Sequence, residues 1–276
     1  MMKLGVMINL DETVEARFAK AAEMGFPTAQ LVCWREAFFT DDYAQRVRVA
    51  SATSGVEVSA FWCGYGGPVV WDNYMGPETI GLVPPAYRFQ RVQTLVRGAA
   101  FAQKLGVKDL ITHAGFLPEE PFHPHYAGVI AALRYVAQAC LDHGLYFLFE
   151  TGEETPTSLL RTIEEIGLPN LGVNLDPANL LLYGRGNPVD SLDVIGRYIR
   201  GVHAKDGCYP TNGRQLGEEK ALGEGRVNFP ALLRGLKALG YDGALTIERE
   251  IEGPQQTADI ITGKQFLEQI LAELEG

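Results

Sequence analysis

Five apolar segments of the chain each stop at a side chain that could bind a metal ion or transfer a proton. The segments read ITHAGF, YFLFETGEE, LGVNLDPAN, IRGVHAKDG and GALTIEREI, and the side chains in question are His113, Glu150, Asp176, His203 and Glu248. The last four residues offer three carboxylates and one imidazole. Such a mostly oxygen ligand set suits Mn²⁺, Mg²⁺, Co²⁺ or Zn²⁺. A carboxylate can also act as a general acid or base.

The elements that must position these residues alternate between short apolar runs and longer amphipathic ones. The apolar runs predict strands buried on both faces, at residues 3–9, 29–34, 56–63, 109–113, 146–150, 171–176, 199–204 and 244–248. Helical patterns that close on a glycine occupy residues 11–25, 85–106, 126–144 and 229–240, and Asp11 is the expected N-cap of the first. Eight strand–helix units predict an α/β fold, a single (β/α)8 TIM barrel that forms one domain over residues 1–276. The alternative, a doubly wound open sheet, lacks a G-x-G-x-x-G motif after the first strand.

A barrel of this kind would bring the ends of separate strands together at one mouth. Neighbouring strands lie about 4.8 Å apart, so Glu150, Asp176, His203 and Glu248 could surround one ion. Each residue alone has a structural explanation: a glutamate at the surface, an aspartate that caps the helix opening at Pro177, and a satisfied buried histidine. Burying several carboxylates together without a cation is prohibitive. The set as a whole therefore favours a metal site.

Charge and composition argue against nucleic acid and membranes as partners. The chain has 24 Lys and Arg residues against 34 Asp and Glu residues, a formal net charge of −10, without a dense basic patch. No stretch approaches the roughly 18 apolar residues of a membrane span, and the start lacks the apolar region of a signal peptide. The four cysteines form no C-x-x-C pair and are expected to be reduced. We therefore expect a cytoplasmic protein.

The sequence resembles the xylose-isomerase-like TIM barrels, the sugar phosphate isomerase/epimerase superfamily that also contains ketose 3-epimerases and endonuclease IV. The resemblance spans essentially the whole chain. It rests on THAGF, FLFETGEET, GVNLDPANLL, RGVHAKDG, ALGEGRVNF and ALTIERE, which occur in the family's order. It implies that Glu150, Asp176, His203 and Glu248 bind one divalent metal ion. It also implies that Glu150 and Glu248 act as acid and base.

The expected function is a metal-dependent isomerase or epimerase of a small-molecule sugar or sugar phosphate. A metal ion held by two adjacent oxygens of an α-hydroxy ketone acidifies the neighbouring C–H. One carboxylate would then remove the proton to give a cis-enediolate, and the other would return a proton. The nearest alternative is a keto-inositol dehydratase or 3-keto-glycoside lyase with the same metal site. An AP endonuclease is disfavoured by the charge, and a non-catalytic sugar-binding barrel by the two potential bases.

Residues near the expected mouth are candidates for substrate contact: His113, Asn179, Lys205, Trp34, Trp62 and Phe116. Aromatic rings can stack on a sugar and exclude water, and a lysine can steady a developing oxyanion. Asn179 stands where endonuclease IV has a metal-binding histidine and many ketose epimerases a substrate-contacting one. A trinuclear zinc site is therefore short of ligands, and the ketose substrates of that branch do not transfer directly. Asp206 and Glu224 are expected to organise the following loop. Barrels of this family often form dimers or tetramers, so a homo-oligomer is also expected.

Overall fold

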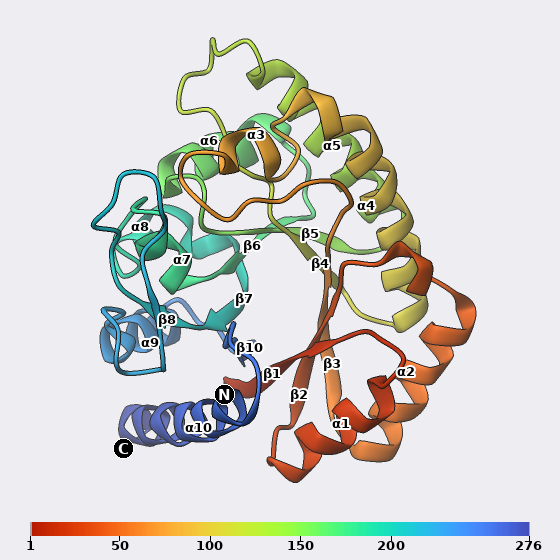
Figure 1. Cartoon of the computed structure of the whole chain (residues 1–276), viewed down its shortest axis with the longest axis vertical. Coiled ribbons are helices and arrows are strands. Elements are labelled where there is room, and N and C mark those ends of the chain that lie inside the picture. Colours follow the sequence, from red (N-terminus) through yellow and green to blue (C-terminus); the bar gives the residue numbers. More distant parts are fainter. Residues whose placement is uncertain (1, 276) are drawn as a thin grey trace.

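The computed structural model describes residues 2–275, and within them eight parallel strands close into a barrel. The strands are β1 (Lys3–Asn9), β2 (Thr28–Cys33), β3 (Glu57–Cys63), β4 (Asp109–Thr112), β5 (Tyr146–Glu150), β6 (Leu171–Leu175), β7 (Ile199–Ala204) and β10 (Ala244–Ile247). The first strand pairs with the last, Lys3 lying opposite Ala244, and Figure 1 shows β1 and β10 side by side. The predicted single (β/α)8 TIM barrel is confirmed.

Helices follow the strands and surround the barrel (Figure 1). The main ones are α1 (Val14–Glu23), α2 (Asp41–Ser54), α4 (Pro85–Leu105), α5 (Tyr126–Asp142), α6 (Pro156–Ile166), α8 (Ser191–Ile195), α9 (Phe229–Ala238) and α10 (Pro254–Glu275). The connections add α3 (Gly76–Thr79), α7 (Pro177–Leu182), the 3-10 helices η1 (Glu36–Phe38) and η2 (Gly196–Tyr198), and a hairpin of β8 (Asp206–Gly207) and β9 (Glu219–Lys220). Among residues 2–275, no helix is both long and apolar enough to cross a membrane.

The predicted elements match the observed ones closely, with one error at a helix start. Every predicted strand is present, and each of its ends lies within one residue of the prediction. The glycines that close the predicted helices all have a positive φ, as at Gly106 (83°). The prediction that Asp11 caps α1 is wrong, because Thr13 occupies that position. The Asp11 carboxylate instead accepts the Thr13 N–H at 2.8 Å and pairs with Arg17.

The barrel interior is filled by side chains that alternate along the strands. A small apolar cluster inside the barrel contains Val32, Ala60, Trp62, Ile111 and Leu148. It is separate from the larger core that joins the strands to the surrounding helices. The four cysteines are free thiols, as expected. The interior cluster fills the middle of the barrel, beneath the carboxyl ends of the strands, where active sites lie in this architecture.

The loop after β7 is organised by one buried carboxylate, as predicted for Asp206. Its two oxygens accept the backbone N–H groups of Gly207 (2.8 Å) and of Gly223, Gly225 and Val227 (3.0 Å each). A Cβ atom on Gly225 would lie 2.0 Å from Asp206 Oδ1, so this approach requires glycine. No matching role is seen for Glu224, which is exposed and has no side-chain hydrogen bond within the described residues.

We expect Asp206→Ala to lower the free energy of unfolding by about 3 kcal/mol or more, because each buried N–H left without an acceptor costs about 1–3 kcal/mol. Asp206→Asn keeps one acceptor oxygen and should lose less. Urea denaturation followed by circular dichroism measures both. Asp190→Ala is the matched control, since Asp190 is exposed and makes no side-chain cap to α8. An Asp206→Ala variant as stable as this control would contradict the prediction.

Candidate metal centre and substrate pocket

The strand register turns the four predicted metal ligands toward the barrel interior. Glu150 ends β5, His203 lies in β7, and Asp176 and Glu248 directly follow β6 and β10. Glu150 pairs with the residue two positions before Asp176, and His203 pairs with the residue two positions before Glu248. Because side chains alternate along a strand, a spacing of two keeps them on the same face. The local sequence ends each strand at this point, and the pairing of neighbouring strands brings these ends together.

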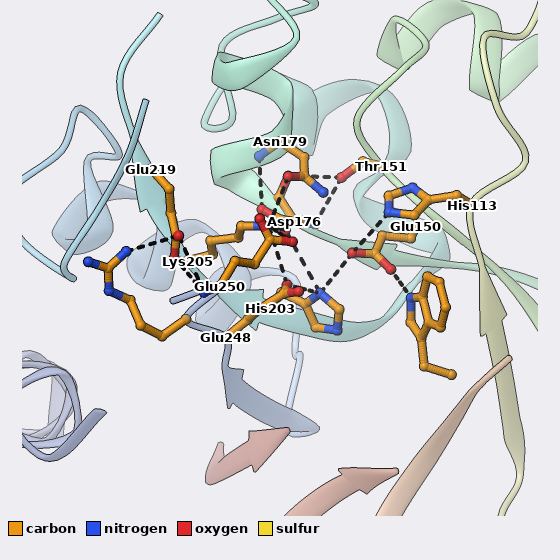
Figure 2. Close-up of polar contacts among 12 residues, drawn as sticks. His113, Glu150, Thr151, Asp176, Asn179, His203, Lys205, Glu219, Glu248 and Glu250 are labelled. Carbon is orange, nitrogen blue, oxygen red and sulfur yellow. Dashed lines mark hydrogen bonds and ion pairs between the residues drawn. The ribbon is translucent and has the colours of Figure 1, made fainter. Parts of the chain in front are cut away.

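These four side chains form one compact group. One ligand atom from each lies within 4.8 Å of all the others. His203 Nδ1 is the centre: it lies 2.9 Å from Glu150 Oε1, 2.9 Å from Glu248 Oε2 and 3.8 Å from Asp176 Oδ2. Figure 2 shows the three carboxylates around the imidazole. Glu150, Asp176 and His203 are buried, and the Glu248 side chain is 12 % exposed.

The unsatisfied atoms of this group fit a divalent cation. Asp176 Oδ2, His203 Nδ1 and Glu248 Oε2 are buried and have no hydrogen-bond partner in the described part of the chain. The short approaches to His203 Nδ1 are therefore close charge contacts without hydrogen-bond alignment. Buried polar atoms are rarely left unpaired, and three that converge on one point indicate a missing partner. Three carboxylates and one imidazole could hold one such ion.

The charges of the group are coupled through the imidazole. Burial alone would lower the pKa of His203, but the carboxylates of Glu150 and Glu248 outweigh it and hold that pKa well above its ordinary value. Burial would raise the pKa of Glu248, but Lys205 and His203 lower it below its ordinary range. In the metal-free protein the imidazolium is therefore the central cation. A divalent ion would have to displace that proton to bind His203.

Outer contacts orient two of the ligands. The Gln30 side-chain amide lies 2.6 Å from His203 Nε2. The amide atom at this contact is Nε2; turned by 180° about its last bond, the amide would present its oxygen instead, which would accept the His203 Nε2 proton and leave Nδ1 free to bind an ion. Asp176 Oδ1 accepts the backbone N–H of Asn179 at 2.9 Å, so Asp176 caps α7 and still turns Oδ2 toward the group. The two roles considered for Asp176 are thus compatible.

Lys205 is a buried member of the site and has little contact with solvent. Its Nζ lies 3.0 Å from Glu250 Oε1 and 3.7 Å from oxygens of both Asp176 and Glu248. It also donates to Asn179 Oδ1 at 3.2 Å. Burial would lower the pKa of Lys205, but Glu248 and Glu250 keep it well above its ordinary value. The ammonium can only donate, so it turns the Asn179 amide oxygen toward itself and leaves the NH₂ group for other partners.

His113 forms a second charged contact at the edge of the group. Its Nδ1 lies 3.0 Å from Glu153 Oε1, and its Nε2 lies 3.8 Å from Glu150 Oε1. Burial would lower the pKa of His113, but Glu153 and Glu150 raise it to about 10. Sequence reasoning did not single out Glu153. The signal was present as a further acid in FLFETGEET, three residues after Glu150.

A cavity of 620 Å³ opens above the group, and several predicted substrate contacts line it. Its walls include Trp34, Trp62, His113 and Asn179, together with Glu150 and Glu248. Lys205 does not line the cavity, but it contacts Asn179, which does. Phe116 lines another cavity, and its ring centroid lies 5.7 Å from that of Tyr183, which lines the main cavity. Trp71 lines the main cavity as well, and so do Glu250 and Glu252, which were not predicted. Their substrate roles stay predictions.

The fold and the site together define a TIM barrel with a carboxylate–histidine centre at the carboxyl ends of its strands. The family model for the xylose isomerase-like TIM barrel matches residues 18–270, so the chain belongs to that family and the resemblance read from its motifs is confirmed. A xylose isomerase domain protein from Planctomyces limnophilus is 33 % identical, with a TM-score of 0.91 and coverage of 98 % of this chain and 97 % of that one.

Two further proteins are similar over nearly the whole chain. The structure of a D-tagatose 3-epimerase-like protein has 23 % identity and a TM-score of 0.77, and the match covers 99 % of this chain and 98 % of that one. An uncharacterised protein of Methanocaldococcus jannaschii is 25 % identical, and the match covers 98 % of this chain and 89 % of that protein. At these identities the epimerase-like structure supports the fold alone.

We expect purified protein to bind one Mn²⁺ ion per chain and His203→Ala to lose it, since the variant removes the one nitrogen among the four candidate ligands. Gln30→Leu should weaken binding by about 10–100-fold through the orientation of His203. Titration calorimetry in two buffers should show proton release, and affinity should rise with pH as the His203 proton becomes easier to displace.

The control for the metal titration is His123→Ala, which changes an exposed loop histidine outside the group. It should bind as the unmodified chain does. Equal affinity in His203→Ala and His123→Ala would show that the ion binds elsewhere.

Proposed function

We propose that this protein is a divalent-metal-dependent isomerase or epimerase of a sugar or sugar phosphate. The observation that carries the proposal is the pair of glutamates, Glu150 and Glu248, at 2.9 Å from one imidazole nitrogen beneath a tryptophan-lined cavity. Family membership supports an enzyme of the sugar isomerase and epimerase type. The fold is shared with an L-ribulose 3-epimerase and with a 3-keto-D-glucoside 4-epimerase from E. coli.

The two glutamates reach the centre from different sides of the barrel. Glu150 comes from β5 and Glu248 follows β10, with β6 and β7 between them. A bound divalent ion would polarise the carbonyl of an α-hydroxy ketone and acidify the adjacent C–H. One carboxylate takes that proton, and the other delivers a proton from the opposite direction. Delivery to the same carbon inverts it, and delivery to the neighbouring carbon gives an isomer.

The surrounding residues supply binding and exclude water. The Asn179 NH₂ group, turned away from Lys205, donates to a carbonyl or hydroxyl oxygen of the substrate. His113, held by Glu153, lies beside Glu150 and contacts a further hydroxyl. Trp34 and Trp62 provide an apolar wall for the carbon face of the sugar. Lys205 balances the charge of the carboxylates that surround it.

A dehydratase or lyase is the second candidate. The fold is shared with a probable 3-DHS dehydratase from Bacillus anthracis. The same pair of carboxylates could remove a proton and then protonate a leaving group at the next carbon. Product analysis separates the two reactions, because elimination releases water or an alcohol and creates a double bond.

The remaining expectations concern partners and location. A net charge of −10 and a centre with a single histidine support a small-molecule substrate over nucleic acid. A cytoplasmic location and a dimeric or tetrameric assembly stay predictions. Sedimentation of the purified chain would decide the assembly.

We expect Glu150→Gln and Glu248→Gln each to lower turnover by at least ~10²–10⁴-fold, the usual contribution of a general acid or base. Glutamine keeps an oxygen that can bind an ion but cannot take the proton. The measurement is deuterium uptake from D₂O into a panel of keto-sugars and inosones with Mn²⁺ present, followed by NMR. Metal occupancy is measured on the same samples, so that lost chemistry is distinguished from lost metal.

The matched control is Glu218→Gln, a largely exposed glutamate outside the cavity, which should exchange at the normal rate. In a two-base epimerase, a single mutant should still exchange the proton on its intact face without net epimerisation. Full epimerisation by Glu150→Gln or Glu248→Gln at full metal occupancy would disprove the two-glutamate mechanism.

A further inference from the structure

The two oxygens of Glu150 face different partners. Oε1 lies 2.9 Å from His203 Nδ1, at the metal centre. Oε2 accepts a hydrogen bond from the indole N–H of Trp62 on β3, two strands away from β5 in the barrel. An indole N–H can only donate a hydrogen bond, so the Glu150 oxygen is the acceptor in this contact. One oxygen of Glu150 is therefore directed to the centre and the other is held outside it.

Trp62 is too tightly packed to follow a carboxylate that rotates. Its side chain is 4 % exposed and belongs to the apolar cluster inside the barrel. Its ring lies 4.9 Å from the ring of Trp34 and 5.7 Å from that of His113, centroid to centroid. Packed aromatic groups keep their rotamers. The indole N–H therefore acts as a fixed point that sets the orientation of the Glu150 carboxylate (Figure 2 shows the dashed contact at Glu150).

The same arrangement occurs at Asp176 and is absent at Glu248. Asp176 Oδ1 accepts the Asn179 N–H at 2.9 Å, while Oδ2 faces the centre without a hydrogen bond. Within residues 2–275, the Glu248 carboxylate accepts no hydrogen bond; it has only the charge contacts with His203 and Lys205. Glu150 and Asp176 thus each have one oxygen that accepts a hydrogen bond from an N–H group outside the centre. The Glu248 carboxylate lacks such a bond among the described residues and is free to change its contacts.

We propose that Trp62 is a positioning residue that limits Glu150 to one ligand oxygen at the metal centre. A carboxylate binds an ion through one oxygen or through both, and each oxygen fills one coordination position. By holding Oε2, Trp62 prevents Glu150 from filling a second position. The inference rests on the proposed function, since it takes the centre to hold a divalent ion. It gives Trp62 a role beyond that of an apolar wall for the sugar.

The test compares Trp62→Phe with the unmodified chain after loading with Co²⁺. Phenylalanine keeps an aromatic ring but removes the N–H donor. The visible absorption of Co²⁺ reports its coordination number and geometry. We expect weaker absorption in Trp62→Phe, because Glu150 can then add its second oxygen. We also expect the dissociation constant for Co²⁺ to change by about 10-fold or more, as for other outer contacts of metal ligands.

Trp34→Phe is the matched control. Trp34 packs against Trp62 and lines the same cavity, but it makes no hydrogen bond to Glu150 among the described residues. Its Co²⁺ spectrum should match that of the unmodified chain. An unchanged Co²⁺ spectrum in Trp62→Phe, or the same change in Trp34→Phe, would overturn the proposal.

A second measurement needs neither Co²⁺ nor a folded Trp62→Phe variant. The chain has three tryptophans, so ¹⁵N labelling gives three indole N–H signals in an NMR spectrum. Trp34→Phe and Trp71→Phe assign two of them, and the third belongs to Trp62. We expect its proton to resonate downfield of the other two and to move upfield in Glu150→Ala. A Trp62 signal that does not respond to Glu150→Ala would overturn the contact.

The outcomes separate this inference from the proposed function. If Co²⁺ binds and Trp62→Phe leaves its spectrum unchanged, the metal-dependent function stands and the role of Trp62 fails. If no divalent ion binds the unmodified chain, the metal-dependent function fails, and with it the ligand role of Glu150. The indole signal would still show whether Trp62 holds that carboxylate.

Discussion

The structure depends on the burial of three carboxylates around one imidazole at the mouth of the barrel. Removing such charges from water is costly unless cations and hydrogen bonds compensate them. In this chain the imidazolium of His203 and the ammonium of Lys205 lie within 4 Å of these carboxylates. Even with these two cations present, Asp176 Oδ2 and Glu248 Oε2 have no hydrogen-bond partner among the described residues. The mouth of the barrel is therefore arranged around a point of negative charge that a divalent ion would occupy.

Both halves of the barrel contribute residues that hold these charged side chains in place. The four candidate ligands come from β5, β6, β7 and β10, in the second half of the chain. Two of their outer contacts come from the first half: Gln30 of β2 contacts His203, and Trp62 of β3 holds Glu150. His113, directly after β4, adds a further contact to Glu150. Closure of the sheet is what brings support and ligand together, so the centre depends on the whole fold.

The residues at the rim of the cavity differ from those that the resemblance to ketose epimerases predicts. Asn179 stands where the resemblance predicts a histidine, and Lys205 sets the direction of its amide. Glu250 neutralises Lys205 from the other side and lines the cavity with Glu252. Sugar hydroxyl groups can donate to these acceptors, whereas an anionic group would meet carboxylates there. Under the proposed function, the metal centre would carry the chemistry, and these rim residues would select the substrate.

The sequence by itself determined the eight strands, the glycine-terminated helices and the four candidate ligands, because periodicity and the residue that ends an apolar run are local signals. Local signals misplaced the start of α1 at Asp11 and missed the β8–β9 hairpin. Only the tertiary structure decided the partners of the ligands. Trp62 lies 88 residues from Glu150 and Gln30 lies 173 residues from His203. Such contacts depend on strand register and barrel closure, which no local pattern in the chain encodes.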